Sequence, residues 1–147
     1  MTTQTAPAAE KPRPARLARV RCSTIDALWS SVSPLIGRAM LDRGSGDCAT
    51  LEEDLREGRA VLWVAWDVIE ILAVVVTQIR IINAIKVCTV VACGGHGLVR
   101  VRHLVDDIER YARAEKCKRI RVHARLGWES VLPDYAPEAI LIAKRLV

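Results

Sequence analysis

One stretch of the chain constrains its fold more than any other: an apolar run, a glycine cluster and a helical pattern in succession. The run from Lys86 to Cys93 is almost continuously apolar and β-branched, which predicts a strand covered on both faces in the centre of a sheet. Gly94, Gly95 and Gly97 follow, with His96 between the last two. Apolar residues then recur at spacings of three and four to about residue 116, which predicts an amphipathic helix.

This arrangement predicts a phosphate site, because the amides at a helix start are unpaired and glycines let a diphosphate approach the backbone. The amides of Gly95, His96, Gly97 and Leu98 are the candidate donors. A purely steric need for glycine would produce the same pattern. Neither a P-loop nor a dinucleotide-binding sheet fits, because Lys-Ser/Thr does not follow the glycines and the βαβ repeat is missing.

The other segments predict a single α+β domain over residues 17–147, after a flexible basic tail rich in Pro and Ala over residues 1–16. Residues 60–66 and 70–79 are rich in Val, Ile and Trp, which predicts two strands that form an antiparallel hairpin. The residues from Ile25 to about Asp42 predict two short helices or one helix kinked at Pro34. A capping box at Thr50 opens another helix. Further strands are expected over 17–22, 119–124 and 139–146, with a short loop-helix element over 127–134, which makes about six strands with helices on both faces.

Composition excludes several classes of protein. No apolar stretch is long enough to cross a bilayer, and the N-terminal residues lack the apolar core of a secretory signal, so we expect a cytoplasmic protein. Five cysteines without a C-x-x-C pair argue against a zinc ribbon or a disulfide framework, and we predict no metal. The net charge is +5, but residues 1–21 carry five basic residues against Glu10, so the rest is near neutral and nucleic-acid binding is disfavoured.

The sequence resembles the GNAT family of acyl-CoA-dependent N-acyltransferases, and in particular small GNAT-like proteins of bacteriophages. The resemblance as a whole extends over nearly all of residues 17–147. It lies in the element order and in five stretches: Gly58 to Asp67, the hairpin strand ending at Thr77, Gly94 to Gly97, Gly127-Trp128, and Val131 to Tyr135. It implies a central mixed, mostly antiparallel sheet. The family's usual loop is Gln/Arg-x-x-Gly-x-Gly/Ala; Gly95 and Gly97 match it, whereas Ala92 stands in place of Gln or Arg.

The resemblance implies an acetyl-CoA site. Its pyrophosphate would lie on the loop from Gly94 to Val99, and its pantetheine arm in a cleft where the strand Lys86–Cys93 diverges from residues 119–124. The implied contacts are Val91, Cys93, Gly94, Gly95, His96, Gly97, Leu98 and Val99.

The resemblance also implies direct transfer of an acetyl group to an amine in a ternary complex. Tyr135, or less favourably Tyr111, would protonate the departing thiolate, and the candidates for the base are Glu70, His96 and His123. The acceptor would be a small molecule or a protein. The alternative is a catalytically inactive GNAT-fold module, such as a phage virion or host-interaction protein, and a homo-oligomer is compatible with either.

Overall fold

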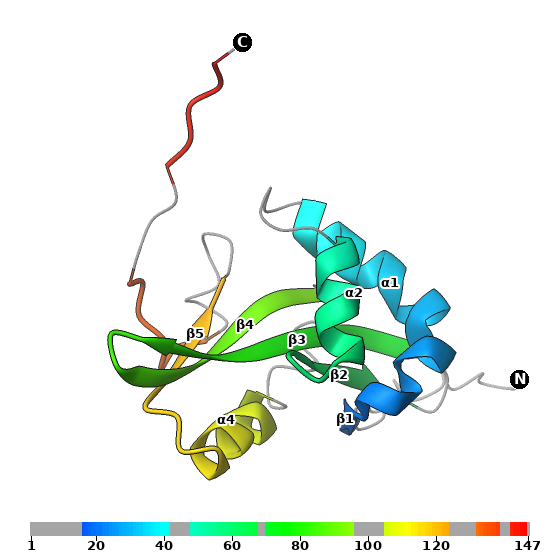
Figure 1. Cartoon of the computed structure of the whole chain (residues 1–147), viewed down its shortest axis with the longest axis horizontal. Coiled ribbons are helices and arrows are strands. Elements are labelled where there is room, and N and C mark those ends of the chain that lie inside the picture. The colour runs from blue at the N-terminus through cyan, green and yellow to red at the C-terminus, as the bar shows by residue number, and fades with distance from the viewer. Residues whose placement is uncertain are drawn as a thin grey trace, which may run out of the picture.

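The computed structural model of the chain describes residues 16–41, 48–67, 70–95, 105–123, 132–138 and 142–146. Within them, five strands form one sheet in the order β1-β2-β3-β4-β5, antiparallel except for the parallel pair β4–β5 (Figure 1). The sheet is therefore mixed and mostly antiparallel, as predicted. The elements are β1 (Arg16–Val20), η1 (Cys22–Thr24), α1 (Ile25–Leu41), α2 (Cys48–Arg56), β2 (Val61–Trp66), β3 (Ile71–Ile82), β4 (Ile85–Gly95), α4 (Val105–Ala114) and β5 (Arg119–Val122).

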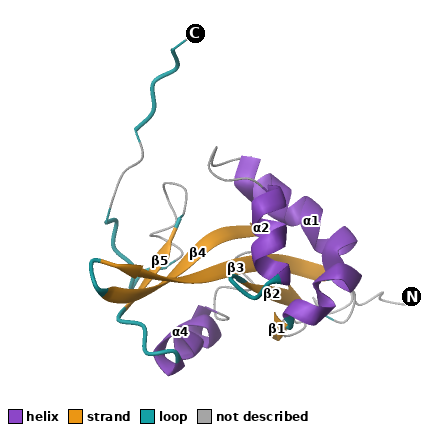
Figure 2. Cartoon of the chain, viewed as in Figure 1, coloured by secondary structure: helices purple, strands orange, loops and turns teal. Residues whose placement is uncertain are grey.

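Helices cover both faces of the sheet. Figure 2 shows α1 and α2 together on one face and α4 on the other. The first face holds the larger core, in which Ile25, Val32 and Ile36 of α1 pack with Leu55 of α2 against apolar side chains of β2, β3 and β4. Pro34 lies inside a continuous α1, so one helix forms rather than two.

The central strand and the hairpin form where the sequence predicts them. Four successive residues of β4, Val87 to Val90, are buried, which confirms a strand covered on both faces. In β2, Trp63 and Trp66 lie on opposite faces: Trp66 packs against the α1–α2 core, whereas Trp63 meets Tyr111 of α4 in an edge-to-face contact with 5.2 Å between ring centroids.

Two boundary predictions are wrong. The expected last strand over 139–146 does not form at residues 142–146, which have no regular secondary structure and are exposed; residues 139–141 lie outside the described part of the chain. The described sheet therefore has five strands rather than about six. The helix expected to open at Thr50 begins at Cys48, so Thr50 is a helical residue and not its N-cap. Residues 127–131 also lie outside the described part, and residues 133–134 form a turn.

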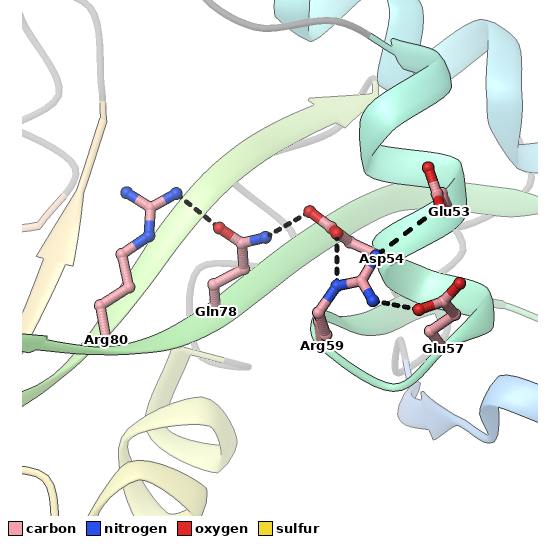
Figure 3. A network of polar contacts seen from close by, with 6 residues as sticks. All are labelled: Glu53, Asp54, Glu57, Arg59, Gln78 and Arg80. Atoms are coloured by element: carbon pink, nitrogen blue, oxygen red, sulfur yellow. Dashed lines mark hydrogen bonds and ion pairs between the residues drawn. The ribbon is translucent and has the colours of Figure 1, made fainter.

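Polar contacts tie the end of α2 to β3 (Figure 3). The Asp54 carboxylate accepts hydrogen bonds from Arg59 Nε at 2.9 Å and from Gln78 Nε2 at 3.1 Å. Its backbone carbonyl accepts the amides of Arg59 and Ala60. Asp54 thus fixes the turn between α2 and β2 against the sheet. Among the described helices, none is long and apolar enough to cross a membrane.

Two buried threonines offer a matched stability test. Thr77 Oγ1 accepts a hydrogen bond from Trp63 Nε1 at 3.0 Å, whereas Thr89 Oγ1 has no hydrogen-bond partner among the described residues; each residue is 1% exposed. We expect Thr77→Val to lower the free energy of unfolding by about 1–3 kcal/mol, because it leaves the buried indole N–H unpaired. Thr89→Val should leave stability unchanged or raise it, because it removes a buried hydroxyl that makes no bond. Urea unfolding measures both, and equal losses would contradict the assignment.

Candidate functional site

The described pairing between β4 and β5 ends before β4 does, and we call the β5-facing edge of β4 from Val91 to Gly95 the wedge. The parallel pairing runs from Val87 opposite Arg119 to Val90 opposite Val122, and the His123 amide donates to the Val90 carbonyl at 3.2 Å. β4 then continues to Gly95, paired with β3 on its other side. Among the described residues, no strand pairs with the β5-facing edge of β4 from Val91 to Gly95. Residues 124–131, which follow β5, lie outside the described part of the chain, so the expected divergence of the two strands stays a prediction. A strand edge of this kind can bind an extended, amide-containing ligand.

A β-bulge marks the point where the wedge opens. Val76 of β3 lies opposite Ala92, and the next residue, Thr77, lies opposite Val90, so Val91 is the extra residue of β4. A bulge leaves the extra residue outside the regular ladder and redirects the neighbouring groups. Both Val91 and Ala92 pack with the α1-side core. The bulge therefore frees backbone polar groups at the start of the wedge while the side chains remain anchored.

The two described glycines of the cluster have steric explanations. A Cβ on Gly94 would lie 2.4 Å from the Leu35 carbonyl oxygen of α1, and one on Gly95 would lie 2.3 Å from the Leu72 carbonyl oxygen of β3. Gly95 also has φ +136°, a conformation that other residues rarely adopt. Close approach of α1 and β3 thus requires these glycines whether or not phosphate binds. His96, Gly97, Leu98 and Val99 lie outside the described residues, so a phosphate site there stays a prediction.

Tyr135 is held against α4. Its hydroxyl donates to Glu109 Oε1 at 2.6 Å, and Glu109 Oε2 lies 3.9 Å from an Arg113 guanidinium nitrogen. Burial, and then the hydrogen bond and negative charge of Glu109, raise the pKa of Tyr135 well above its usual range. The phenol therefore stays protonated at neutral pH, as a proton donor must.

The three candidate bases lie in different places. Glu70 is exposed in the β2–β3 turn, where its amide donates to Asp67 Oδ1 at 2.9 Å. It precedes Val76, opposite the bulge, by six residues of extended chain, or about 20 Å at ~3.3 Å per residue. Glu70 is therefore far from the bulge along β3, although it precedes Ala73, the partner of Gly95 at the other end of the wedge, by three residues. His123 is exposed at the end of β5, at the wedge itself. His96 lies outside the described residues.

Tyr111 and Cys88 are explained by packing. Tyr111 meets Trp63 edge to face, and the Arg19 guanidinium lies 4.9 Å from the centroid of its ring. Burial raises the pKa of Tyr111 and raises that of Cys88 to about 11, so Cys88 is a protonated thiol in the sheet rather than a nucleophile. Within the described ranges, no group of three or more His, Cys, Asp and Glu residues could hold a metal ion.

The sequence interpretation did not identify two features of this region. The bulge at Val91 has no local signal, because the run around it is apolar throughout. Glu109 and Tyr135 are 26 positions apart, and nothing in their spacing predicts contact. The basic residues Arg119 and Arg121 of β5 both form ion pairs with Glu138, the latter at 2.8 Å.

The chain has the GNAT fold, by comparison with solved structures. A predicted acetyltransferase with acetyl-CoA from Clostridium acetobutylicum is similar with a TM-score of 0.63 and 12% identity, covering 90% of this chain and 96% of that one. Glucosamine-6-phosphate N-acetyltransferase from Arabidopsis thaliana gives 0.63 and 12%, covering 90% and 99%. A GNAT family acetyltransferase from Staphylococcus aureus gives 0.59 and 14%, covering 90% and 99%.

These likenesses are of fold alone, given the low identities. No family model matches the chain, and no curated protein matches it. The comparisons give no support to the bacteriophage origin that the sequence resemblance suggested.

Proposed function

We propose that the protein is an N-acetyltransferase that transfers an acetyl group from acetyl-CoA to an amine by direct attack in a ternary complex. The observation that supports the proposal is the wedge: in the described residues, β5 pairs with β4 as far as Val90, and β4 continues past a bulge to the glycine pair. A strand edge of this kind suits an arm with two amide groups, such as pantetheine. Acetyl-CoA is also the ligand named for one of the structural neighbours.

In this proposal, different residues bind the two parts of acetyl-CoA. The edge of β4 from Val91 to Gly95 binds the pantetheine arm, and Val91 and Cys93 contact it. The loop over residues 94–99 binds the diphosphate. When bound, acetyl-CoA supplies a thioester carbonyl and a thiolate leaving group. The protein contributes positioning and two proton transfers.

Tyr135 and a histidine carry the protons. The Tyr135 hydroxyl hydrogen, held toward Glu109 in the structure, rotates about the Cζ–O bond to donate to the departing sulfur. We assign acceptance of the ammonium proton to His123, because it lies where β5 leaves β4. His96 remains a second candidate for that role from the sequence. Glu70 is disfavoured because of its distance from the bulge along β3.

A binding module without catalysis is the second candidate function. The observation that favours it is Ala92, which stands where the family has Gln or Arg and is 1% exposed in the α1-side core. The steric roles of Gly94 and Gly95 favour it too, because they explain those glycines without a ligand.

Isothermal titration with acetyl-CoA and with CoA tests the proposal. We expect one-to-one micromolar binding, unchanged when residues 1–15 are removed; the deletion stops there because Arg16 is part of β1. A thiol-release assay against a panel of amines then measures transfer. His123→Gln should lower kcat by about 10²-fold with little change in the affinity for acetyl-CoA. Absence of binding at millimolar acetyl-CoA would reject the enzyme and favour the binding module.

A further inference from the structure

A row of polar side chains crosses the α2-side face of the sheet just before the wedge. Gln78 of β3 lies opposite Thr89 of β4, and Thr89 lies opposite Arg121 of β5. Directly paired residues present their side chains on the same face of a sheet. Gln78 Nε2 donates to the Asp54 carboxylate at the end of α2, which identifies that face (Figure 3). Thr89 precedes Val91, where the wedge begins, by two residues.

Two buried polar atoms of this row make no hydrogen bond with any described residue: Thr89 Oγ1 and Arg121 Nε. Thr89 is 1% exposed. Arg121 Nε lies 2.8 Å from Glu138 Oε2, but its N–H is not directed at that oxygen. Buried polar atoms of native proteins are nearly always hydrogen-bonded, so two unpaired ones on neighbouring residues indicate a place where a polar group binds. Both atoms can donate, and the group that suits them is therefore an acceptor.

The charge at this place favours an oxyanion. Arg119 and Arg121 both form ion pairs with Glu138, so one carboxylate contacts two guanidinium groups. A third guanidinium, that of Arg80, lies on the same face, because Arg80 follows Gln78 by two residues in β3 (Figure 3). Guanidinium groups bind carboxylates and phosphates through charge-assisted, often paired hydrogen bonds.

Glu138 indicates how such an anion reaches the site. The Arg121 side chain is 33% exposed and the Glu138 side chain 45% exposed, so their ion pair is open to solvent. A carboxylate or phosphate of a ligand can displace the Glu138 carboxylate from Arg121. A second oxygen of that ligand can then accept from Thr89 Oγ1, which makes no hydrogen bond to Glu138.

The histidine assigned as the base lies on the same face. His123 follows Arg121 by two residues, and its amide continues the β4–β5 ladder by donating to the Val90 carbonyl. Strand alternation therefore turns both side chains to the α2 side, with their Cα atoms about 7 Å apart at ~3.3 Å per residue. Tyr135 is bonded to α4, on the opposite face. An amine that approaches His123 from the α2 side thus has the rest of its molecule near Arg121 and Thr89.

We propose that Thr89 and Arg121 bind an oxyanion, either a carboxylate or a phosphate, that belongs to the amine accepting the acetyl group. The identity of the ligand as the acceptor rests on the proposed function, whereas the oxyanion site does not. The preferred acceptor is an ω-amino acid or an amino-phosphate, whose amine reaches His123 while its oxyanion binds Arg121. Arg119 adds positive charge beside the site, and Glu138 is the carboxylate that the ligand displaces.

Paired acceptors that differ in the oxyanion test the proposal. Thiol release at saturating acetyl-CoA gives kcat/KM for δ-aminovalerate against pentylamine, and for phosphoethanolamine against ethanolamine. We expect the anionic member to be the better substrate by about 10–10²-fold in at least one pair, which is the range for hydrogen bonds to a charged group. The pair with the larger preference identifies the oxyanion as a carboxylate or a phosphate.

Substitutions locate the preference. Arg121→Gln should lower kcat/KM for the anionic acceptor by about 10–10²-fold, and Thr89→Val by about tenfold, with a much smaller change for the neutral amine and for KM of acetyl-CoA. Glu138→Gln should raise kcat/KM for the anionic acceptor, because it removes the competing charge. The matched control is Arg110→Gln, which removes the same charge from a 77% exposed side chain of α4 and should change neither acceptor.

Two results would overturn the proposal: equal kcat/KM within both pairs, or a preference that survives Arg121→Gln and Thr89→Val, since these two residues would then bind only water. If no amine is acetylated, the proposed function fails, and isothermal titration of the full chain with phosphoethanolamine and with δ-aminovalerate decides the oxyanion site by itself. Binding that Arg121→Gln weakens and Glu138→Gln strengthens would support the site. Absence of binding at millimolar ligand would reject it.

Discussion

Gly95→Ala is expected to lower the free energy of unfolding by about 3–5 kcal/mol, a large share of the roughly 5–15 kcal/mol that stabilises a domain. Two costs add. The new Cβ would lie 2.3 Å from the Leu72 carbonyl oxygen and 2.6 Å from Ala73 Cα, so backbone must move. In addition, φ +136° is a conformation that alanine adopts only under strain. Urea unfolding followed by tryptophan fluorescence measures the loss.

Two other glycines provide controls that separate these costs. Gly58 has φ +78° and nothing within 4 Å of an added Cβ, so Gly58→Ala should cost only the strain, about 1–2 kcal/mol. Gly37 lies inside α1 with open space around it, and Gly37→Ala should raise stability by about 0.5–1 kcal/mol. If Gly95→Ala cost no more than Gly58→Ala, the close approach of β4 to the start of β3 would be wrong.

Because Gly94 and Gly95 are required by packing, a substitution at either position cannot by itself test whether a ligand binds there. A charged residue at Gly95 would remove acetyl-CoA binding by distorting the sheet, even if no phosphate touches that amide. The sequence pattern could not separate the two explanations, because a glycine required by a neighbouring backbone and one required by a ligand look the same. Only the positions of Leu35 and Leu72, 59 and 23 residues before their glycines, separate them.

Local patterns predicted most of the fold. The β2–β3 hairpin and the doubly covered β4 follow from β-branched runs and their spacing, and the helices from three-and-four periodicity. Residues 142–146 show where such patterns fail. These residues favour a strand, but a strand also requires a partner edge, and the local sequence does not indicate which edge that is. The same limit hid the bulge at Val91, which exists only in the register between β3 and β4.

The candidate site could be predicted only in part, because its contacts join residues that are far apart in the sequence. The family resemblance implies both a divergence of β4 from β5 and a role for Tyr135. The partner of Tyr135 was not predicted, because the contact joins a helix to a loop 26 positions later. Glu70 is a candidate for its chemistry, and the predicted hairpin already places it at the β2–β3 turn. Its distance from the bulge depends on the register between β3 and β4, which composition does not determine.

Tyr135→Phe is expected to lower kcat for acetyl transfer by about 10²-fold with KM for acetyl-CoA nearly unchanged, because the hydroxyl acts only when the thiolate leaves. The substitution removes one oxygen and keeps the ring, so the segment over residues 132–138 should keep its packing. Steady-state thiol release on the best acceptor measures the effect. An unchanged kcat would remove Tyr135 from the reaction, whereas a loss of kcat together with a lower unfolding midpoint would indicate a structural role.

The pH dependence of kcat in the variant Glu109→Gln distinguishes a proton-donating role of Tyr135 from a structural one. A phenol donates only while protonated, and burial together with Glu109 keeps the pKa of Tyr135 above its ordinary value of about 10. The rate that depends on Tyr135 should therefore hold from neutral pH to beyond that value. Glutamine keeps a hydrogen-bond acceptor but removes the negative charge, so the pKa of Tyr135 falls toward its ordinary value and the alkaline limb of kcat moves to lower pH. If Tyr135 only anchored the loop to α4, the same substitution would change stability and leave the alkaline limb in place.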